Sequence, residues 1–186
     1  MTEPSRPTLA DQIARIQLVA LDVDGVLTDG VVEVTDGQTP EAKRFHVADG
    51  LGIQLLLHAG LLVAWISGRR STAVAARAAE LGVAHLSQGV RNKAQVLAEL
   101  MAEHSLTQDQ VAFMGDDLND LPAFSLAGLK AAPANAINEI KALADLVTER
   151  SGGDGAVREF CDVVLKVQGR WNDAVSSYLA AQLRQE

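Results

Sequence analysis

Short apolar runs alternate along this chain with segments whose hydrophobic positions recur every three or four residues. The runs are nearly continuous and too short for helices, which is typical of parallel strands buried on both faces of a sheet. We expect strands at 17–23, 61–66, 84–86, 111–114, 129–131 and 146–147. We expect helices at 9–16, 50–58, 72–81, 92–104, 119–126, 136–143, 156–167 and 171–183.

Polar and glycine residues mark the ends of these segments. Asp49 is expected to cap the helix at 50–58, and Ser71 the helix at 72–81. Two further strands, 30–34 and 41–47, are separated by a turn at 35–40 and predict a hairpin. The Gly-rich stretch 151–155 is expected to be a flexible linker.

The alternation of strands and helices predicts an α/β fold. We expect a doubly wound, mostly parallel, Rossmann-like sheet with helices on both faces and the hairpin as a small flap at about 30–47. We expect no large cap domain. The 186 residues fit a single domain, 1–186, with a C-terminal tail from about 151.

Composition and charge narrow the possible partners. The net charge is −8 and only 4% of residues are aromatic, which argues against nucleic-acid binding. The single cysteine, Cys161, excludes an internal disulfide, and no Cys/His cluster has zinc spacing. Residues 1–11 lack a signal-peptide pattern and no apolar run could span a bilayer, so we expect no membrane partner and a cytoplasmic location.

Acidic residues follow two of the predicted strands. Asp22 and Asp24 come after the first strand, and Asp116 and Asp117 begin an acidic stretch after the strand at 111–114. Capping of the next helix explains part of each cluster. However, carboxyl ends of parallel strands meet at one edge of the sheet, where crowded carboxylates repel each other unless a cation compensates them. The better interpretation is a Mg²⁺ site.

Two further strand ends carry groups that suit an anion. Ser67 and Gly68 follow the strand at 61–66, with a hydroxyl and an accessible backbone N–H above a helix N-terminus. Lys93 lies near the start of the helix at 92–104, where the helix dipole disfavours a cation, and this conflict suggests pairing with carboxylates or phosphate. A plain turn and an exposed lysine are the alternatives.

In this order, Asp22 and Asp24, Ser67, Lys93, and Gly115 to Asp117 resemble the four motifs of the haloacid dehalogenase superfamily of phosphohydrolases. The resemblance implies that Asp22 is the nucleophile and forms an aspartyl-phosphate, and that Asp24 is the general acid and base. It implies that Ser67 and Lys93 bind the phosphoryl group. Mg²⁺ would be held by Asp22, the backbone carbonyl of Asp24, Asp116 and, through water, Asp117, which could instead orient Lys93.

Longer stretches resemble the subfamily of 3-deoxy-D-manno-octulosonate 8-phosphate (Kdo-8-phosphate) phosphatases: 22–30, 45–53, 67–70, 77–83, 88–93, 115–120 and 152–162. The resemblance implies a sugar-phosphate substrate and a homotetramer in which a neighbour's hairpin and tail help to cover the pocket. It implies these substrate contacts: His46, Asp49, Gly50, Arg69, Arg77 and Arg158.

The chain departs from the subfamily pattern at Ala48 and Gln54, where basic residues are usual. Arg69 fits the eight-carbon acid better than a nonulosonate 9-phosphate, which stays open as an alternative substrate. A phosphoacceptor receiver domain of signalling proteins also uses an acid cluster, Mg²⁺, a hydroxyl and a lysine. Receivers lack the second acid of the Asp22–Asp24 pair, which disfavours that alternative.

Overall fold

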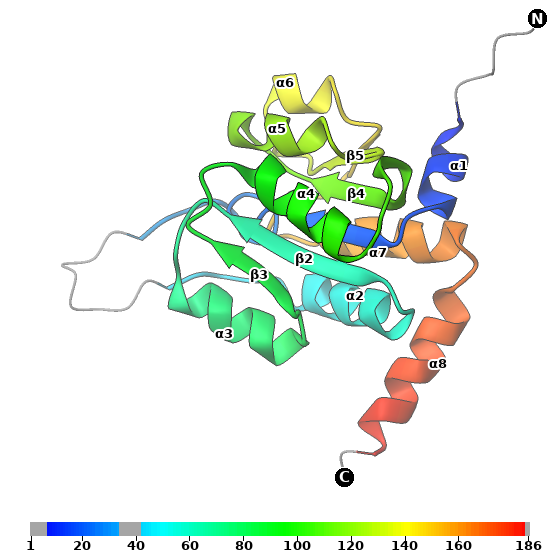
Figure 1. Cartoon of the computed structure of the whole chain (residues 1–186). Helices are drawn as coiled ribbons and strands as arrows, with labels where there is room; N and C mark the ends of the chain where they lie inside the picture. Colours follow the sequence, from blue (N-terminus) through cyan, green and yellow to red (C-terminus); the bar gives the residue numbers. More distant parts are fainter. Residues whose placement is uncertain (1–6, 34–41, 185–186) are drawn as a thin grey trace, which may run out of the picture.

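Six parallel strands form one sheet in the computed structural model, which describes residues 7–33 and 42–184. The strands lie in the order β3-β2-β1-β4-β5-β6, so the chain winds outward from β1 in both directions (Figure 1). This is the doubly wound arrangement that the sequence predicts. Their bounds are β1 (Leu18–Leu21), β2 (Leu62–Ser67), β3 (His85–Gln88), β4 (Val111–Met114), β5 (Leu129–Ala132) and β6 (Leu146–Val147).

Helices cover both faces of the sheet (Figure 1). One face packs against α1 (Leu9–Ala14), α2 (Val47–His58), α3 (Thr72–Leu81), α7 (Ala156–Val167) and α8 (Trp171–Gln182). The other packs against α4 (Lys93–Glu103), α5 (Leu121–Phe124) and α6 (Asn138–Lys141). Two short 3-10 helices, η1 (Gln108–Gln110) and η2 (Leu118–Asp120), precede β4 and α5.

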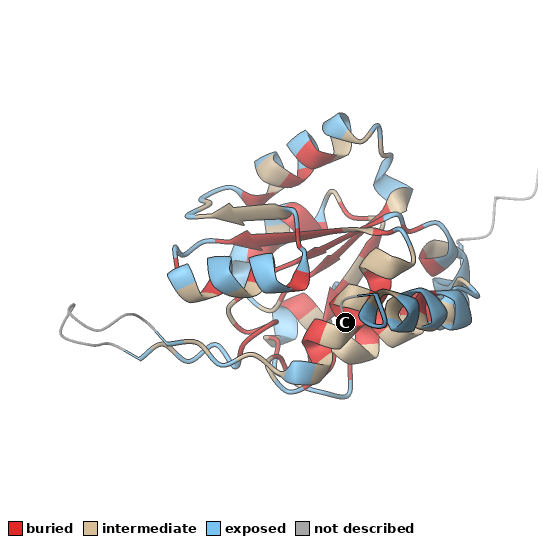
Figure 2. Cartoon of the chain, turned by 90° about the horizontal axis from the view of Figure 1, so that it is seen from below, coloured by how far each residue is buried: buried red, intermediate tan, exposed pale blue. Residues whose placement is uncertain are grey.

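The central strands are buried between these two layers (Figure 2). Along β1, Val19 and Leu21 face the α2 and α7 layer, whereas Leu18 and Ala20 face α4 and α5. All four side chains are fully buried. Burial of a large aliphatic side chain contributes about 1.5–3 kcal/mol, so both layers hold β1 at the centre of the sheet.

The expected hairpin is not formed in its described parts. Residues 30–33 and 42–46 have no strand, and residues 34–41 lie outside the described chain. Charged side chains of these flanks pair with the loop after β1 instead: Lys43 with Asp24, and Arg44 with Asp29. A two-stranded ribbon without a third strand or a helix beside it has little stability of its own.

The start of α2 also differs from the prediction. The helix begins at Val47 with His46 as its N-cap residue, so Asp49 lies inside the first turn and does not cap this helix. Its carboxylate accepts a hydrogen bond of 2.7 Å from the backbone N–H of Arg158, in the first turn of α7. The N-cap of α7 is Gly155, which has no side chain to satisfy that N–H, and Asp49 supplies the missing acceptor.

The Gly-rich stretch 151–155 packs against the loop after β1 and is not the flexible linker that the sequence predicts. The N–H of Gly152 donates to Asn135 Oδ1 at 2.6 Å, and Asn135 Nδ2 donates to the carbonyl of Gly25 at 3.0 Å. The N–H of Gly153 donates to the carbonyl of Val26 at 3.1 Å. A Cβ at Gly152 would collide with the backbone of Gly25, so only glycine allows this approach.

Five expected helices are shorter than predicted: the segment 119–126 divides into η2 and α5, 136–143 shortens to α6, 9–16 to α1, 92–104 to α4 and 171–183 to α8. Pro122 lies in the first turn of α5, where its missing N–H costs no helical hydrogen bond. No helix in the described ranges has the length and apolar character needed to cross a bilayer.

Candidate active site

The predicted acidic clusters meet at the carboxyl ends of two neighbouring strands. Asp22 follows β1 directly, and its backbone N–H donates to the carbonyl of Met114, the last residue of β4, at 2.9 Å. Asp116 lies two residues beyond the end of β4. The chain reverses its winding direction between β1 and β4, and ligands of doubly wound sheets bind at this point.

Three carboxylates lie together at the carboxyl ends of β1 and β4. Oxygen atoms of Asp22, Asp116 and Asp120 lie within 4.8 Å of one another. Gly25, at φ +98°, lets the loop after β1 approach Asp116, because a Cβ there would collide with the Asp116 carboxylate. The prediction that the side chains at 22 and 116 point into one crevice is therefore confirmed.

Lys93 lies among these carboxylates. Its Nζ is 2.7 Å from Asp22 Oδ1 and 2.6 Å from Asp120 Oδ1, and its side chain is 2% exposed. Asp120 is fixed in turn by the backbone N–H groups of Asp116, at 2.9 Å, and Asp117, at 3.3 Å. Asp120 therefore orients Lys93, a role that the sequence interpretation offered to Asp117. The exposed Asp117 accepts from the N–H of Leu118 at 2.7 Å and caps η2.

The pKa values of this cluster reflect uncompensated negative charge. Burial and then the Asp120 carboxylate raise the pKa of Asp22 to about 6. Burial, with the Asp22 and Asp120 carboxylates, raises the pKa of Asp116 to about 8. Burial opposes the charge on Lys93, but Asp22 and Asp120 outweigh it and raise the pKa of Lys93. One ammonium group thus faces three carboxylates.

A divalent cation fits this donor set. Hard carboxylate oxygens are the ligands that Mg²⁺ prefers, and Asp116 Oδ1 is buried without a hydrogen-bond partner in the described structure. A cation at this position would supply the missing positive charge and a partner for that oxygen. The cluster that could hold it consists of Asp22, Asp116 and Asp120.

Asp24 and Ser67 lie on the other side of this site. Ser67 Oγ donates to Asp24 Oδ2 at 3.3 Å and accepts from the backbone N–H of Arg69 at 3.1 Å. The almost fully buried Lys43 ammonium pairs with Asp24 Oδ1. A cavity of about 260 Å³ lies between Asp24 and the acidic cluster. It is lined by Asp22, Asp24, Gly30, Gly68, Arg69, Asp116, Asp117 and Asn119.

The predicted substrate residues divide into two groups. Arg69 lines the cavity, whereas His46, Asp49, Gly50, Arg77 and Arg158 do not. Arg77 lies against Gly50 of α2 and pairs with Glu80 at 2.8 Å. Arg158 pairs with Asp162 at 2.7 Å and borders another cavity, of about 310 Å³. The substrate role of these five residues stays a prediction.

Three residues of the site were not predicted from the sequence. Asp120 lies in the acidic stretch that helix capping partly explains, and its place in that stretch is the signal that could have identified it. Lys43 and Asn135 gave no signal, because their roles depend on contacts with the loop after β1.

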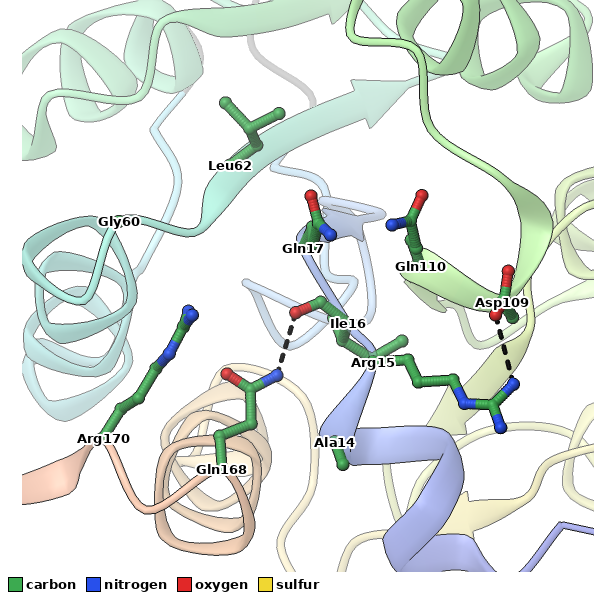
Figure 3. Close-up of a pocket in the computed structure, with 10 residues that line it drawn as sticks. All are labelled: Ala14, Arg15, Ile16, Gln17, Gly60, Leu62, Asp109, Gln110, Gln168 and Arg170. Carbon is green, nitrogen blue, oxygen red and sulfur yellow. Dashed lines mark hydrogen bonds and ion pairs between the residues drawn. The ribbon is translucent and has the colours of Figure 1, made fainter.

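A larger cavity, of about 730 Å³, lies at the opposite, amino end of the strands (Figure 3). Its single carboxylate, Asp109, pairs with Arg15 at 3.2 Å, and Gln168 Nε2 donates to the carbonyl of Ile16 at 2.9 Å. Size alone does not make it the active site, because its lining has neither clustered carboxylates nor a buried lysine.

Comparison with known proteins agrees with this geometry. The model of the haloacid dehalogenase-like hydrolase family matches residues 53–160. The chain is 42% identical over 171 residues to 3-deoxy-D-manno-octulosonate 8-phosphate phosphatase KdsC of Escherichia coli (strain K12), covering 90% of each chain.

Two solved structures of such phosphatases also resemble this chain. That from Moraxella catarrhalis, in complex with magnesium, phosphate and KDO, has a TM-score of 0.86 at 38% identity over 91% of this chain and 97% of its own. The cobalt-bound form from Haemophilus influenzae has a TM-score of 0.83 at 38% identity, over 90% and 99%. The chain belongs to the haloacid dehalogenase-like hydrolases and is a phosphatase.

Proposed function

We propose that this phosphatase is Mg²⁺-dependent and hydrolyses 3-deoxy-D-manno-octulosonate 8-phosphate to the free sugar acid and phosphate. The observation that carries the proposal is the meeting of Asp22, Asp116, Asp120 and Lys93 in one crevice. The name of the relatives, which match this chain over nine-tenths of its length, supports the substrate.

Asp22 is the proposed nucleophile. Its Oδ1 is held by Lys93, which leaves the other oxygen to attack phosphorus in line with the leaving group. With a pKa of about 6, Asp22 is mostly a carboxylate at neutral pH. The Asp22–phosphorus bond forms as the bond from phosphorus to the sugar oxygen breaks, and water then displaces phosphate from Asp22.

Asp24 is the proposed general acid and base. It protonates the leaving sugar oxygen and then takes a proton from the attacking water, so its own protonation is restored over the cycle. Such help is typically worth about 10²–10⁴-fold in rate. Its contacts with Ser67 and Lys43 hold the carboxylate at the cavity wall.

Positive and hydrogen-bonding groups would balance the charge of the phosphoryl group. Ser67 and Lys93 are the proposed side-chain partners, with the backbone N–H groups near Val23 and Gly68. Mg²⁺, held by Asp22, Asp116 and the backbone carbonyl of Asp24, would neutralise the repulsion between the nucleophile and the anionic phosphate. Asp120 lies within the same cluster, and Asp117 remains a proposed ligand through water.

We further propose a homotetramer, in which the C-terminal tail of a neighbour, including Arg158, helps to cover the pocket. Exposed apolar side chains on α8 and directly after it support a contact surface: Leu179 is 55% exposed and Leu183 77%. Sedimentation velocity of the purified chain tests this proposal, and a monomer at the concentrations used for activity would contradict it.

A phosphate-release screen tests the function. With Mg²⁺ present, we expect kcat/KM for Kdo-8-phosphate to exceed that for nonulosonate 9-phosphates and other sugar phosphates. A preference for a nonulosonate phosphate would contradict the proposed substrate but not the proposed phosphatase mechanism. Unchanged turnover in Asp22→Asn, or after complete chelation of divalent ions, would overturn the chemistry.

A further inference from the structure

Two imidazole rings and a carboxylate gather at the edge of the sheet, away from the active site. His85, Glu103 and His104 each offer one ligand atom, and these three atoms lie within 4.8 Å of one another. The two rings meet edge to face, with centroids 5.0 Å apart and planes at 88°. His85 begins the edge strand β3, whereas Glu103 and His104 close α4.

The strand geometry brings His85 beneath α4. Successive side chains of a strand point to opposite faces of the sheet. Leu86 packs on the face covered by α2 and α3. His85 therefore points to the other face, where Leu97 and Leu100 of α4 are buried.

Hydrogen bonds at the C-terminal end of α4 fix the backbone of His104. The N–H of Leu106 donates to the carbonyl of Met101 at 2.8 Å, and the N–H of Ser105 donates to that of Ala102 at 3.2 Å. This hydrogen-bond pair is the Schellman motif. Ser105 adopts the left-handed conformation, φ 54°, which is unfavourable for a non-glycine residue. The backbone of His104 is thus fixed before any ligand binds.

A ring contact between two surface histidines is the simpler interpretation, but it leaves one atom unexplained. His104 Nε2 is buried and has no hydrogen-bond partner in the described chain. A buried polar atom without a partner destabilises the folded state. A metal ion would satisfy the lone pair of a neutral imidazole and would explain why a carboxylate lies beside both rings.

We propose that His85, Glu103 and His104 form a binding site for a divalent transition-metal ion such as Zn²⁺. Two imidazoles with one carboxylate match the ligands of Zn²⁺, and water fills the fourth position. In a tetrahedral site, two ligands at about 2.1 Å from one ion lie about 3.4 Å apart, so the site closes by at most about 1.4 Å on binding. The exposed Glu103 side chain is free to make that movement.

The proposed site is distinct from the Mg²⁺ site in place and in chemistry. Lys93, at the first turn of α4, belongs to the active site, whereas the histidines lie at the other end of this 11-residue helix. At 1.5 Å per residue, the two ends are about 16 Å apart. The active-site cluster has only carboxylates, which suit Mg²⁺, and imidazoles favour the softer ion. Bound metal would join the edge strand to the end of α4.

The test uses the full chain, saturated with Mg²⁺ and labelled with ¹⁵N-histidine. The chain has four histidines, so each ring can be followed during a Zn²⁺ titration. We expect one equivalent of Zn²⁺ to shift the ring signals of His85 and His104 together and to leave those of His58 in place. The melting temperature should rise at the same stoichiometry.

Three variants make the result specific. His104→Gln should abolish the Zn²⁺ shift of His85, and Glu103→Gln, at an exposed position, should weaken binding about tenfold or more without affecting folding. His58→Gln is the matched control and should bind as the parent does. All three should release phosphate at the parental rate with Mg²⁺. A His85 shift that survives in His104→Gln, or no histidine shift in the parent, would overturn the proposal.

Discussion

Loading the active site with Mg²⁺ should release protons, and the raised pKa values of Asp116 and Asp22 set the expected number. With pKa values of about 8 and about 6, Asp116 is about nine-tenths protonated at pH 7 and Asp22 about one-tenth. A metal ligand must be deprotonated, so binding at pH 7 releases about one proton in total. At pH 9 both carboxyls are already mostly ionised, and the release falls to about a tenth of a proton.

The same competition sets the pH dependence of affinity. Protons compete with the ion below the pKa of Asp116, so affinity for Mg²⁺ falls as pH falls. Between pH 9 and pH 7 the dissociation constant should rise about tenfold, which corresponds to about 1.4 kcal/mol. Below pH 6 the protonation of Asp22 steepens the loss.

Isothermal titration calorimetry measures this release directly. Titration of Mg²⁺ at pH 7 in two buffers with different ionisation enthalpies gives the proton number from the difference in observed heat. Asp109→Asn, at the opposite end of the sheet, is the matched control and should release the same number. A heat that is independent of buffer at pH 7, or an affinity unchanged between pH 7 and pH 9, would refute the reasoning.

Further substitutions at three positions test the site and the fold around it. Gly25→Ala should abolish Mg²⁺ binding with the fold intact, because its Cβ displaces the Asp116 carboxylate; calorimetry and circular dichroism check this, and parental affinity would contradict it. Lys43→Gln should lower kcat/KM about tenfold or more, since Asp24 loses its ion pair; unchanged kinetics would remove Lys43 from the site. Asp49→Ala should destabilise the protein by about 1 kcal/mol in urea unfolding, because α7 loses its acceptor. Burial raises the pKa of Asp49 in the folded protein, so the free energy of unfolding falls as pH rises from the unfolded-state pKa towards the folded-state pKa. Asp49→Asn keeps the hydrogen-bond acceptor and should lose this pH dependence. Equal pH profiles of stability for the parent and Asp49→Asn would contradict the assignment.

The periodicity of the sequence was sufficient to predict the sheet. Each of the six strands overlaps its predicted segment, and 111–114 and 156–167 match β4 and α7 residue for residue. Nearly continuous apolar runs are specific for buried parallel strands. Helix ends were harder to predict, because Asp49 has the sequence pattern of a cap for its own helix but caps α7 across the fold.

Site residues were predictable from the sequence where an acidic residue comes soon after a predicted strand. Asp22 and Asp116 follow strands that become neighbours, so the sheet alone brings them together. Asp120 and Lys43 act through side chains that reach other elements, and nothing local distinguishes such residues from a cap or a surface lysine. Glycines of the stretch 151–155 suggested flexibility, although here they allow close packing on the loop after β1.

The most direct test of the central claim is to trap phosphate on Asp22. An aryl phosphate, whose leaving group needs no acid, should phosphorylate the Asp24→Asn variant, which cannot activate water for the second step. Acid quench and peptide mass spectrometry should then find one phosphoryl group per chain on Asp22. Phosphate release by this variant at the parental rate, with no phosphoryl group on Asp22, would contradict the account.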